Sequence, residues 1–423
     1  MHTRLVVRPL IALFVLASGV VVTTQDTKSP AEQRIASAQK AIDANPKQAQ
    51  PYADLALALT RRARETGDPT YYARADEALS KALAIQPDSF DARKIQAWVL
   101  LGKHEFARAR EVAAVLNKQV PDDVLVYGFL ADANAELGDY KAAEDAVQWM
   151  LDMRAGNLSG LTRAAYLREL FGDIDGALEA FSMAYSRMAP SEIEDRAWVL
   201  SQMGHLYLSS GKQTEAESAL QQALMLFPKY HYALGYLAKV RVSQQRYQEA
   251  VSLLRELCSA LPHAENIHAL AQALDLAKSP EAPQTYAEFE KRALAESVSQ
   301  DNANRELIAY YADYAKKPHE ALRIAEIERS RRHDVYTLDA YAWALSQSGN
   351  HLQARKEMDQ ALAVGIKNAE FFYHSGVIAS RLKNPEIATR DLTRSIEQSP
   401  YSPVAASARA LLDGLKRAPT SKR

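Results

Sequence analysis

Few residues of this sequence have the type and spacing that metal or thiol chemistry requires. The ten histidines are scattered, and His263 and His268 are the nearest pair on one segment. A spacing of five places two helical side chains about 140° apart, so these rings cannot ligate one metal from a straight helix. The single cysteine, Cys258, excludes an intrachain disulfide and a multi-cysteine metal site. We expect it to pack as a small apolar side chain, and we predict neither metal nor cofactor.

Motifs that would indicate catalysis are also missing from the sequence. It contains no phosphate-binding Gly-x-x-x-x-Gly-Lys-Ser/Thr, no Gly-x-Gly-x-x-Gly after a strand, and no Gly-x-Ser-x-Gly. The segment from Gly172 to Gly176 is too short for a calcium loop and is interpreted as a turn. Asn157 and Ser159 form a glycosylation sequon, which we interpret as ordinary loop sequence. The residues therefore predict binding rather than catalysis.

The charge balance narrows the class of partner. Lys and Arg number 51 against 52 Asp and Glu, which gives a formal net charge of -1. Recognition of phosphates normally shows as a clustered basic excess, so nucleic acid is not expected to be the partner. The charged run from Arg323 to Arg332 is interpreted as a solvated helix end.

Alanines recur every 34 residues through most of the chain. This period marks the pairs of helices that must position any binding residues. The period is carried by the alanines Ala109, Ala143 and Ala177, then Ala216 and Ala250, then Ala354 and Ala388. A proline follows twelve positions later in several repeats, as from Ala109 to Pro121, where it ends the second helix. Pairs such as Gly138 and Asp139 mark the turns between helices.

These features resemble the tetratricopeptide repeat, a helix-turn-helix with small residues where its two helices cross. The small residues near the eighth position of the first helix are Ala97, Ala131, Ala165, Gly204, Ala238, Ala309, Ala342 and Gly376. Antiparallel helices approach closely only when the residues at their crossing lack bulk. The resemblance covers roughly residues 31–417 and implies an all-α fold, a right-handed superhelical α-solenoid of about nine or ten repeats.

Departures from the pattern suggest the domain organisation. The stretch from Thr60 to Tyr72 predicts a longer loop in the first full repeat. Pro280 and Pro283 mark a degenerate repeat that is either a bend in the solenoid or a lengthened loop. We therefore divide the chain into an N-terminal array (25–263), the degenerate repeat (264–300), a C-terminal array with a capping helix (301–417) and a basic tail (418–423).

Binding residues can be placed because the resemblance puts the first helix of each repeat along a concave groove. Positions two, five, nine and twelve of that helix face the groove, and there the sequence is rich in aromatic residues, which favour binding. The candidate partner-binding residues there and beside them are Tyr166, Trp198, His205, Lys239, Tyr310, Tyr336, Asp339, Trp343, Tyr373 and His374. Tyr310 and Trp343 either face the groove or pack between repeats, whereas Tyr236 is expected in the core.

One binding mode of the family can be tested on the sequence. Some tetratricopeptide domains clamp a C-terminal carboxylate with a lysine and an asparagine of the same repeat. Here Lys94 is followed by Trp98 where the asparagine would stand, so the clamp is not reproduced. An extended or helical segment of a partner is the expected ligand.

Residues 1–24 have the features of a signal peptide. Arg4 and Arg8 precede an apolar run from Pro9 to Val22, which is shorter than the ~20 residues that a membrane-spanning helix needs. The alternative is an uncleaved N-terminal anchor. In both cases we expect the rest of the chain to be exported, either periplasmic or secreted, with no further membrane insertion.

The sequence therefore predicts a non-enzymatic, exported scaffold or adaptor. It would bind a peptide or helix of partner proteins in its concave groove during assembly of cell-envelope complexes. The alternatives are a structural subunit of a secretion or polysaccharide-export machine and a glycan-binding protein. The fold alone does not identify the partner.

Overall fold

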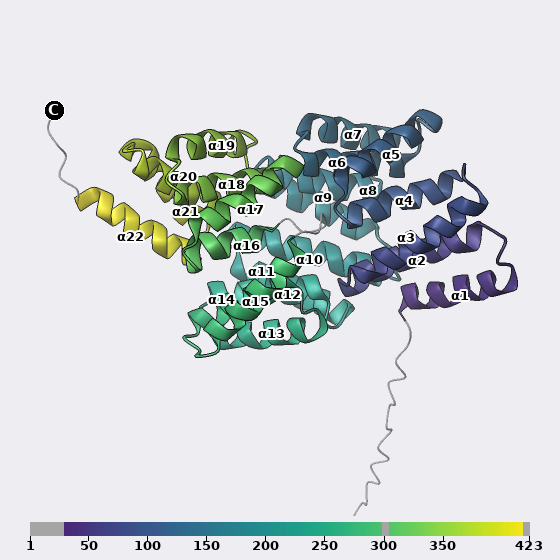
Figure 1. Ribbon diagram of the computed structural model, residues 1–423, viewed down its shortest axis with the longest axis horizontal. Coiled ribbons are helices and arrows are strands. Elements are labelled where there is room, and N and C mark those ends of the chain that lie inside the picture. The colour runs from purple at the N-terminus through teal and green to yellow at the C-terminus, as the bar shows by residue number, and fades with distance from the viewer. Residues whose placement is uncertain (1–28, 298–303, 418–423) are drawn as a thin grey trace, which may run out of the picture.

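The computed structural model describes residues 29–297 and 304–417, and Figure 1 shows their arrangement. These residues form 22 α-helices and one π-helical turn, with no strand among them, which confirms the all-α solenoid. The predicted signal peptide and basic tail lie outside the described residues. The helices are α1 (Pro30–Ala44), α2 (Gln50–Thr66), α3 (Thr70–Ile85), α4 (Phe90–Gly102), α5 (Phe106–Gln119), α6 (Val124–Leu137), α7 (Tyr140–Met153), α8 (Leu158–Leu170), α9 (Ile174–Arg187), α10 (Ile193–Ser209), α11 (Gln213–Leu226), α12 (His231–Ser243), α13 (Tyr247–Ala260), α14 (Ala264–Leu276), α15 (Ala282–Glu296), α16 (Arg305–Ala309), the π-helical turn (Tyr310–Tyr314), α17 (Pro318–Arg331), α18 (Val335–Gln347), α19 (His351–Ala363), α20 (Ala369–Arg381), α21 (Pro385–Gln398) and α22 (Pro403–Arg417).

Each even-numbered helix from α2 to α20 packs against the odd-numbered helix that follows it, which gives ten helix pairs between α1 and α22. The alanines that carry the 34-residue period are all 0% exposed. At the helix crossings, a Cβ atom on Gly204 would lie 2.6 Å from the Cγ atom of Leu220. A Cβ atom on Gly376 would lie 2.7 Å from the Cγ atom of Leu392. The small residues are therefore required by close helix packing.

Polar residues of the turns begin the following helices. The Asp173 carboxylate accepts a hydrogen bond from the Gly176 amide at 3.0 Å, and the Asn157 side chain accepts one from the Gly160 amide at 2.6 Å. Each contact satisfies an amide at a helix start that has no partner within the helix. These side chains are helix caps, as the interpretation of the Gly172 segment as a turn predicted.

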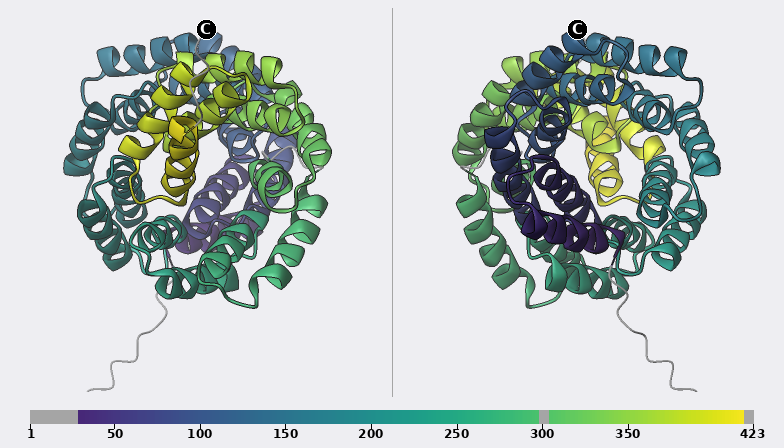
Figure 2. Two further views of the ribbon diagram at one scale, coloured as in Figure 1. Left: turned by 90° about the vertical axis from the view of Figure 1, so that its left-hand side faces the viewer. Right: turned by 90° about the vertical axis from the view of Figure 1, so that its right-hand side faces the viewer.

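The even-numbered helices line the inside of the solenoid. Several consecutive even-numbered helices contact each other, such as α2 with α4 and α10 with α12, whereas consecutive odd-numbered helices do not pack together in this way. The side of a curved stack on which helices approach one another is its concave side. Viewed along the long axis, the helices form a ring around that axis (Figure 2).

The solenoid curves so tightly that successive superhelical turns touch. The Val335 amide donates a hydrogen bond to the Tyr140 hydroxyl at 2.9 Å, although 195 positions separate the two residues. The Gln398 side chain donates to the Ser209 carbonyl oxygen at 2.8 Å across 189 positions. One apolar cluster also joins residues of α6, α7 and α8 to residues of α18, α19 and α20. These contacts close the space between turns.

Two predictions about individual segments are wrong, and both segments take part in these contacts. The additional residues after Thr60 extend α2 instead of lengthening a loop, and they carry Arg64 to within 3.2 Å of Asp195. The charged run after Arg323 is not wholly solvated, because Glu328 and Arg332 are only 1% and 3% exposed.

The proline-containing segment forms an ordinary helix pair. Pro283 lies in the first turn of α15, where its missing amide leaves no hydrogen bond unmade, and α14 packs against α15. None of the described helices is long and apolar enough to cross a membrane.

Candidate functional site

The structure separates the ten predicted groove residues into three sets. Tyr166, His205, Lys239 and Tyr336 lie on the even-numbered helices α8, α10, α12 and α18 and are partly or fully exposed. Asp339, Trp343, Tyr373 and His374 form a second, largely buried cluster on α18 and α20. Trp198 and Tyr310 pack against other rings.

The first set is built around a stack of aromatic rings. The ring of His205 stacks on that of Tyr236, with centroids 4.9 Å apart and an interplanar angle of 22°. The Nε2 atom of His205 lies 2.9 Å from a carboxylate oxygen of Glu169, and the Lys239 ammonium lies 5.6 Å from the Tyr236 ring centroid. Tyr236, which we expected in the core, is therefore a half-buried member of this set.

The next superhelical turn supplies the other side of the set. The Arg305 guanidinium lies 4.7 Å from the ring centroid of Tyr336 and 3.4 Å from the Asp334 carboxylate. The Tyr166 hydroxyl donates a hydrogen bond to Glu136 at 3.1 Å. Burial and the Asp334 charge raise the pKa of Glu136 to about 6. Residues from α6, α8, α16 and α18 are thus brought together by the contact between turns.

This set lies on even-numbered helices, which line the concave side of the solenoid. Tyr232 is 37% exposed, yet surrounding protein still raises the pKa of its hydroxyl. Part of the Glu265 side chain contacts solvent. The protein around the carboxyl group, together with the charge of Glu306, nevertheless raises its pKa to about 7. Burial also raises the pKa of Tyr336, and so does Glu169 from the preceding turn.

We call this set the inner surface. It consists of Tyr166, Glu169, His205, Tyr232, Tyr236, Lys239, Glu265, Arg305, Glu306, Tyr336 and Glu370. Four of these residues, Tyr166, His205, Lys239 and Tyr336, are among the ten candidates predicted from the sequence. The others lie on α8, α12, α14, α16 and α20, and their approach depends on the curvature of the solenoid, which no local pattern reveals.

The second cluster packs between α18 and α20. The indole of Trp343 stacks on His374 with centroids 4.1 Å apart and donates its N–H to Asp313 at 3.0 Å. The Nδ1 atom of His374 lies 2.9 Å from the Asp339 carboxylate. Burial alone would lower the pKa of His374, but Asp339 raises it to about 9, so the imidazole is protonated at neutral pH. Tyr373, half-buried beside Trp343, is the most accessible of the four predicted residues here.

The remaining predicted residues pack within the array. Tyr310 is 6% exposed and meets the ring of Phe289 edge to face at 5.3 Å. Trp198 is half-buried and meets Phe181 edge to face at 5.8 Å. The alternatives left open for Tyr310 and Trp343 are thereby decided, because both side chains are buried.

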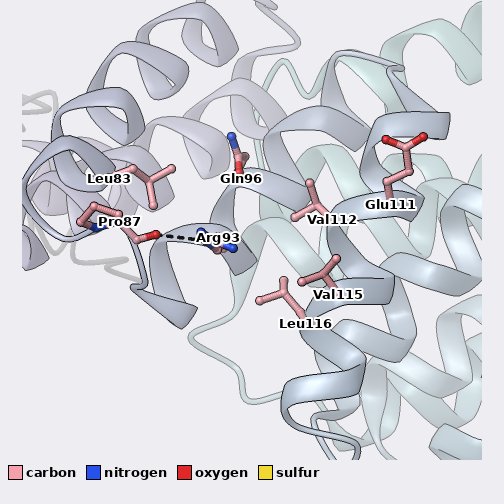
Figure 3. Close-up of a pocket in the computed structure, with 8 residues that line it drawn as sticks. All are labelled: Leu83, Pro87, Arg93, Gln96, Glu111, Val112, Val115 and Leu116. Atoms are coloured by element: carbon pink, nitrogen blue, oxygen red, sulfur yellow. Dashed lines mark hydrogen bonds between the residues drawn. The ribbon is translucent and has the colours of Figure 1, made fainter.

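A cavity lies between α3, α4 and α5. Figure 3 shows this cavity of about 440 Å³, whose lining includes Leu83, Val112 and Val115. Its one basic side chain, Arg93, donates a hydrogen bond to the Pro87 carbonyl oxygen at 3.1 Å. The lining is mainly apolar and includes none of the residues of the inner surface.

The histidines and the cysteine that the structure describes do not gather into a metal site. Within residues 29–297 and 304–417, no group of three or more His, Cys, Asp or Glu side chains is placed to hold a metal ion. Cys258 packs against an apolar cluster, and burial raises the pKa of its thiol to about 11. The thiol is therefore protonated at neutral pH, and a protonated thiol is neither a nucleophile nor a metal ligand.

Comparisons with known proteins agree with this architecture. A family model described as tetratricopeptide repeat matches residues 96–158 and 201–265. The human IFIT1 dimer with PPP-AAAA is similar with a TM-score of 0.50 and 13% identity, over 86% of this chain and 86% of that chain. These values show a shared fold. No curated protein matches the sequence.

Two other solved structures are similar over part of this chain. The APC/C hetero-tetramer Cut9–Hcn1 has a TM-score of 0.44 and 15% identity over 86% of this chain, which spans 55% of the matched chain. A tetratricopeptide repeat protein from Parabacteroides merdae has a TM-score of 0.37 and 18% identity, over 62% of this chain and 99% of that one.

Proposed function

Because this chain is a tetratricopeptide-repeat protein, we propose that it is a non-enzymatic adaptor that holds a segment of a partner protein against its inner surface. Proteins with this fold are protein-binding scaffolds and are generally non-catalytic. The ligand is a peptide or a short helix, because a groove formed by stacked helices offers a continuous lining to a linear segment.

The tyrosines of the inner surface are the observation that carries this proposal. Tyr166, Tyr236 and Tyr336 are half-buried, and Tyr232 is 37% exposed. Tyrosine offers a large apolar face and a polar hydroxyl, and it loses little rotamer entropy when a ligand fixes it. Four such rings on one concave surface make a binding surface rather than a packed core.

The experiment uses photo-crosslinking at single positions. A photoreactive phenylalanine analogue replaces Tyr232 on the inside, and the same analogue replaces Met225, which is 74% exposed on α11, as the control. We expect one defined partner to crosslink from position 232 and not from position 225. Crosslinks from position 225 alone would place the binding surface outside the solenoid and overturn the proposal.

A pair of substitutions then measures the contribution of the rings. Tyr166→Ala and Tyr336→Ala should each weaken binding of that partner by about 30-fold, and together by several hundredfold, because interface tyrosines at hot spots contribute ~2 kcal/mol each. Circular dichroism checks that the variant remains folded. Unchanged affinity in a folded variant would remove the tyrosines from the interface.

Nucleic acid is not the proposed ligand. The human IFIT1 structure contains PPP-AAAA. In this chain, the inner surface instead carries the carboxylates of Glu265, Glu306 and Glu370, which repel phosphate groups.

We also propose that the protein is exported, to the periplasm or out of the cell, and takes part in assembling cell-envelope complexes. This rests on Arg4, Arg8 and the apolar run that follows them. Residues 1–30 fused to a reporter that is active only outside the cytoplasm should give activity. Replacing the apolar residues from Leu10 to Leu13 with serine and asparagine is the control and should abolish it. An inactive unmodified fusion would contradict export.

A further inference from the structure

The superhelical turns are held together differently at two places. The middle contact joins α6, α7 and α8 to α18, α19 and α20 through one apolar cluster, which includes Val335, Ile366 and Phe371. Separating the turns there would expose these side chains to water, which is costly. The N-terminal contact joins the end of α2 and the turn after it to α10, α12 and the residue that follows α13.

The N-terminal contact is polar. The Arg64 guanidinium lies 3.3 Å from a carboxylate oxygen of Glu194 and 3.2 Å from one of Asp195. The His231 ring donates a hydrogen bond to the Arg64 carbonyl oxygen at 3.0 Å. Among the described residues, no buried apolar cluster joins α1–α4 to α10–α14. Ion pairs and a hydrogen bond therefore hold this contact, without an apolar core of its own.

The charges that meet at the N-terminal contact separate at low cost. The side chains of Arg64 and Asp195 are 27% and 33% exposed, so water already reaches both. Glu194 accepts a hydrogen bond from the Tyr230 hydroxyl at 2.5 Å, and it keeps this partner when Arg64 leaves. Partly exposed ion pairs contribute little net free energy, because water solvates the separated charges. The N-terminal contact is therefore weaker than the middle contact.

The helices on one side of this contact form a unit with its own core. One apolar cluster consists only of residues between Ile35 and Val99, all on α1 to α4. The unit joins the rest of the array through a second cluster on α4, α5 and α6, which includes Leu116 and Phe129. In a repeat array each repeat needs only its neighbours. The helices α1 to α4 can therefore move away from α10 to α13 without losing their own packing.

The N-terminal contact lies beside the inner surface. His231 directly precedes Tyr232, an inner-surface residue, and their ring centroids lie 4.2 Å apart. In the turn after α2, a Cβ atom on Gly67 would lie 2.8 Å from the Cδ1 atom of Leu261. Such a close approach leaves no space for a ligand to pass between the turns here. While the contact is closed, a ligand reaches the inner surface only from elsewhere.

We propose that α1 to α4 form a gate, which Arg64 holds closed and which opens at the N-terminal contact while the middle contact stays closed. Opening the gate admits a segment of a partner protein to the inner surface from the side, between the turns. This admission rests on the adaptor function proposed above, whereas the movement itself requires no partner.

Distances across both contacts test the gate in the full chain. Nitroxide labels on Ala73→Cys in α3 and Ala260→Cys in α13 report the N-terminal contact, and labels on Glu144→Cys in α7 and Ser330→Cys in α17 report the middle contact. All four positions are exposed, and Cys258→Ala removes the native thiol. Double electron–electron resonance measures each distance at about 0.1 M and about 1 M NaCl, between which the Debye length falls from about 10 Å to about 3 Å.

Arg64→Ala should lengthen the distance across the N-terminal contact by about 10 Å, roughly the width of one helix, and leave the distance across the middle contact unchanged. The higher salt concentration should act in the same direction, because it screens the ion pairs. Arg255→Ala is the matched control: it breaks an ion pair with Glu281, 2.8 Å long, between neighbouring parts of the array, and it should change neither distance. Arg64→Lys keeps the charge and should keep the gate closed. Circular dichroism checks the fold of each variant.

Crosslinking then tests what the gate admits. The photoreactive phenylalanine analogue replaces Tyr166 on α8, which lies outside the gate. At a limiting concentration of the partner, Arg64→Ala should raise the crosslinking yield from this position by about threefold or more, because a larger fraction of the protein is open to the ligand. Arg255→Ala should leave the yield unchanged.

The outcomes separate this inference from the proposed function. Unchanged distances in the Arg64→Ala variant and at high salt, or equal lengthening across both contacts, would overturn the gate. If the gate opens but the crosslinking yield from position 166 does not rise, the partner enters elsewhere, so the inference fails while the adaptor function stands. If no partner crosslinks from position 166 or 232, the adaptor function fails, and the distances alone decide whether the gate moves.

Discussion

Replacing Gly172 with alanine should separate two superhelical turns. Gly172 follows α8 with φ +77°, and a Cβ atom added there would lie 2.3 Å from the carbonyl oxygen of Gly365. Real side chains do not approach a backbone oxygen so closely, so one of the two segments must move. Because Gly365 belongs to the connection between α19 and α20, the movement loosens the contact between turns.

The magnitude follows from a control with the same backbone geometry. Gly349 has φ +87° and no atom within 4 Å of an added Cβ atom. Gly349→Ala should therefore cost only ~1–2 kcal/mol, the cost of a left-handed conformation with a side chain. Gly172→Ala carries that cost and also an overlap, which adds about 1–3 kcal/mol in a packed environment. The difference in free energy of unfolding between the two variants measures how strongly the contact between Gly172 and Gly365 resists separation.

Equilibrium urea unfolding, followed by circular dichroism, gives the free energy of unfolding of each variant. Hydrogen exchange should also become faster in the Gly172→Ala variant around Phe171 and around residues 362–372, where the two turns meet. Equal losses of stability in the two variants, without faster exchange at this contact, would refute the argument that the turns are held together.

Three other predictions concern packing and protonation. Gly204→Ala should lower the free energy of unfolding by about 1–3 kcal/mol, because the added Cβ atom overlaps the buried side chain of Leu220. Gly235→Ala should raise it by up to ~1 kcal/mol, because the nearest atom to its Cβ atom is 3.8 Å away and alanine favours the helix. Urea unfolding measures both values. Because Asp339 raises the pKa of His374 from 6.5 to about 9, this pair should stabilise the protein fully below pH 6.5 and lose that contribution, roughly 3 kcal/mol at most, as the pH rises through 9. Urea unfolding across this pH range should show that loss, and Asp339→Asn should abolish it. Cys258, whose thiol pKa is about 11, should react with a maleimide at pH 7 far more slowly in the folded protein than in urea, and equal rates would contradict its burial.

The repeat architecture can be predicted from the sequence because its signals are local. The alanines of the 34-residue period and the small residues at the crossings mark where helices touch, and the structure buries those alanines completely. Each signal depends on contacts between neighbouring helices only, as expected for a repeat array. The fold class and the approximate number of repeats can therefore be predicted from a single sequence.

The contacts between turns could not be predicted in the same way. Tyr140 and Val335 meet because small rotations accumulate over several repeats, and no spacing in the sequence records that sum. The same limit applies to the aromatic residues: Tyr310 packs in the core, while Tyr336 reaches the inner surface. Tyr310 begins the π-helical turn after α16, whereas Tyr336 lies in the first turn of α18, and the 34-residue spacing does not indicate the π-helical turn.

The contact between Tyr140 and Val335 also determines how the molecule must fold. In an open repeat array each repeat needs only its neighbours, so folding can spread along the chain and stop at any repeat. Here the apolar cluster that joins α6, α7 and α8 to α18, α19 and α20 stays incomplete until distant repeats have formed. Closing so long a loop is slow and comes late, so the ring should assemble as one cooperative unit. During synthesis, the N-terminal repeats must wait with an apolar face open to water until the C-terminal repeats emerge.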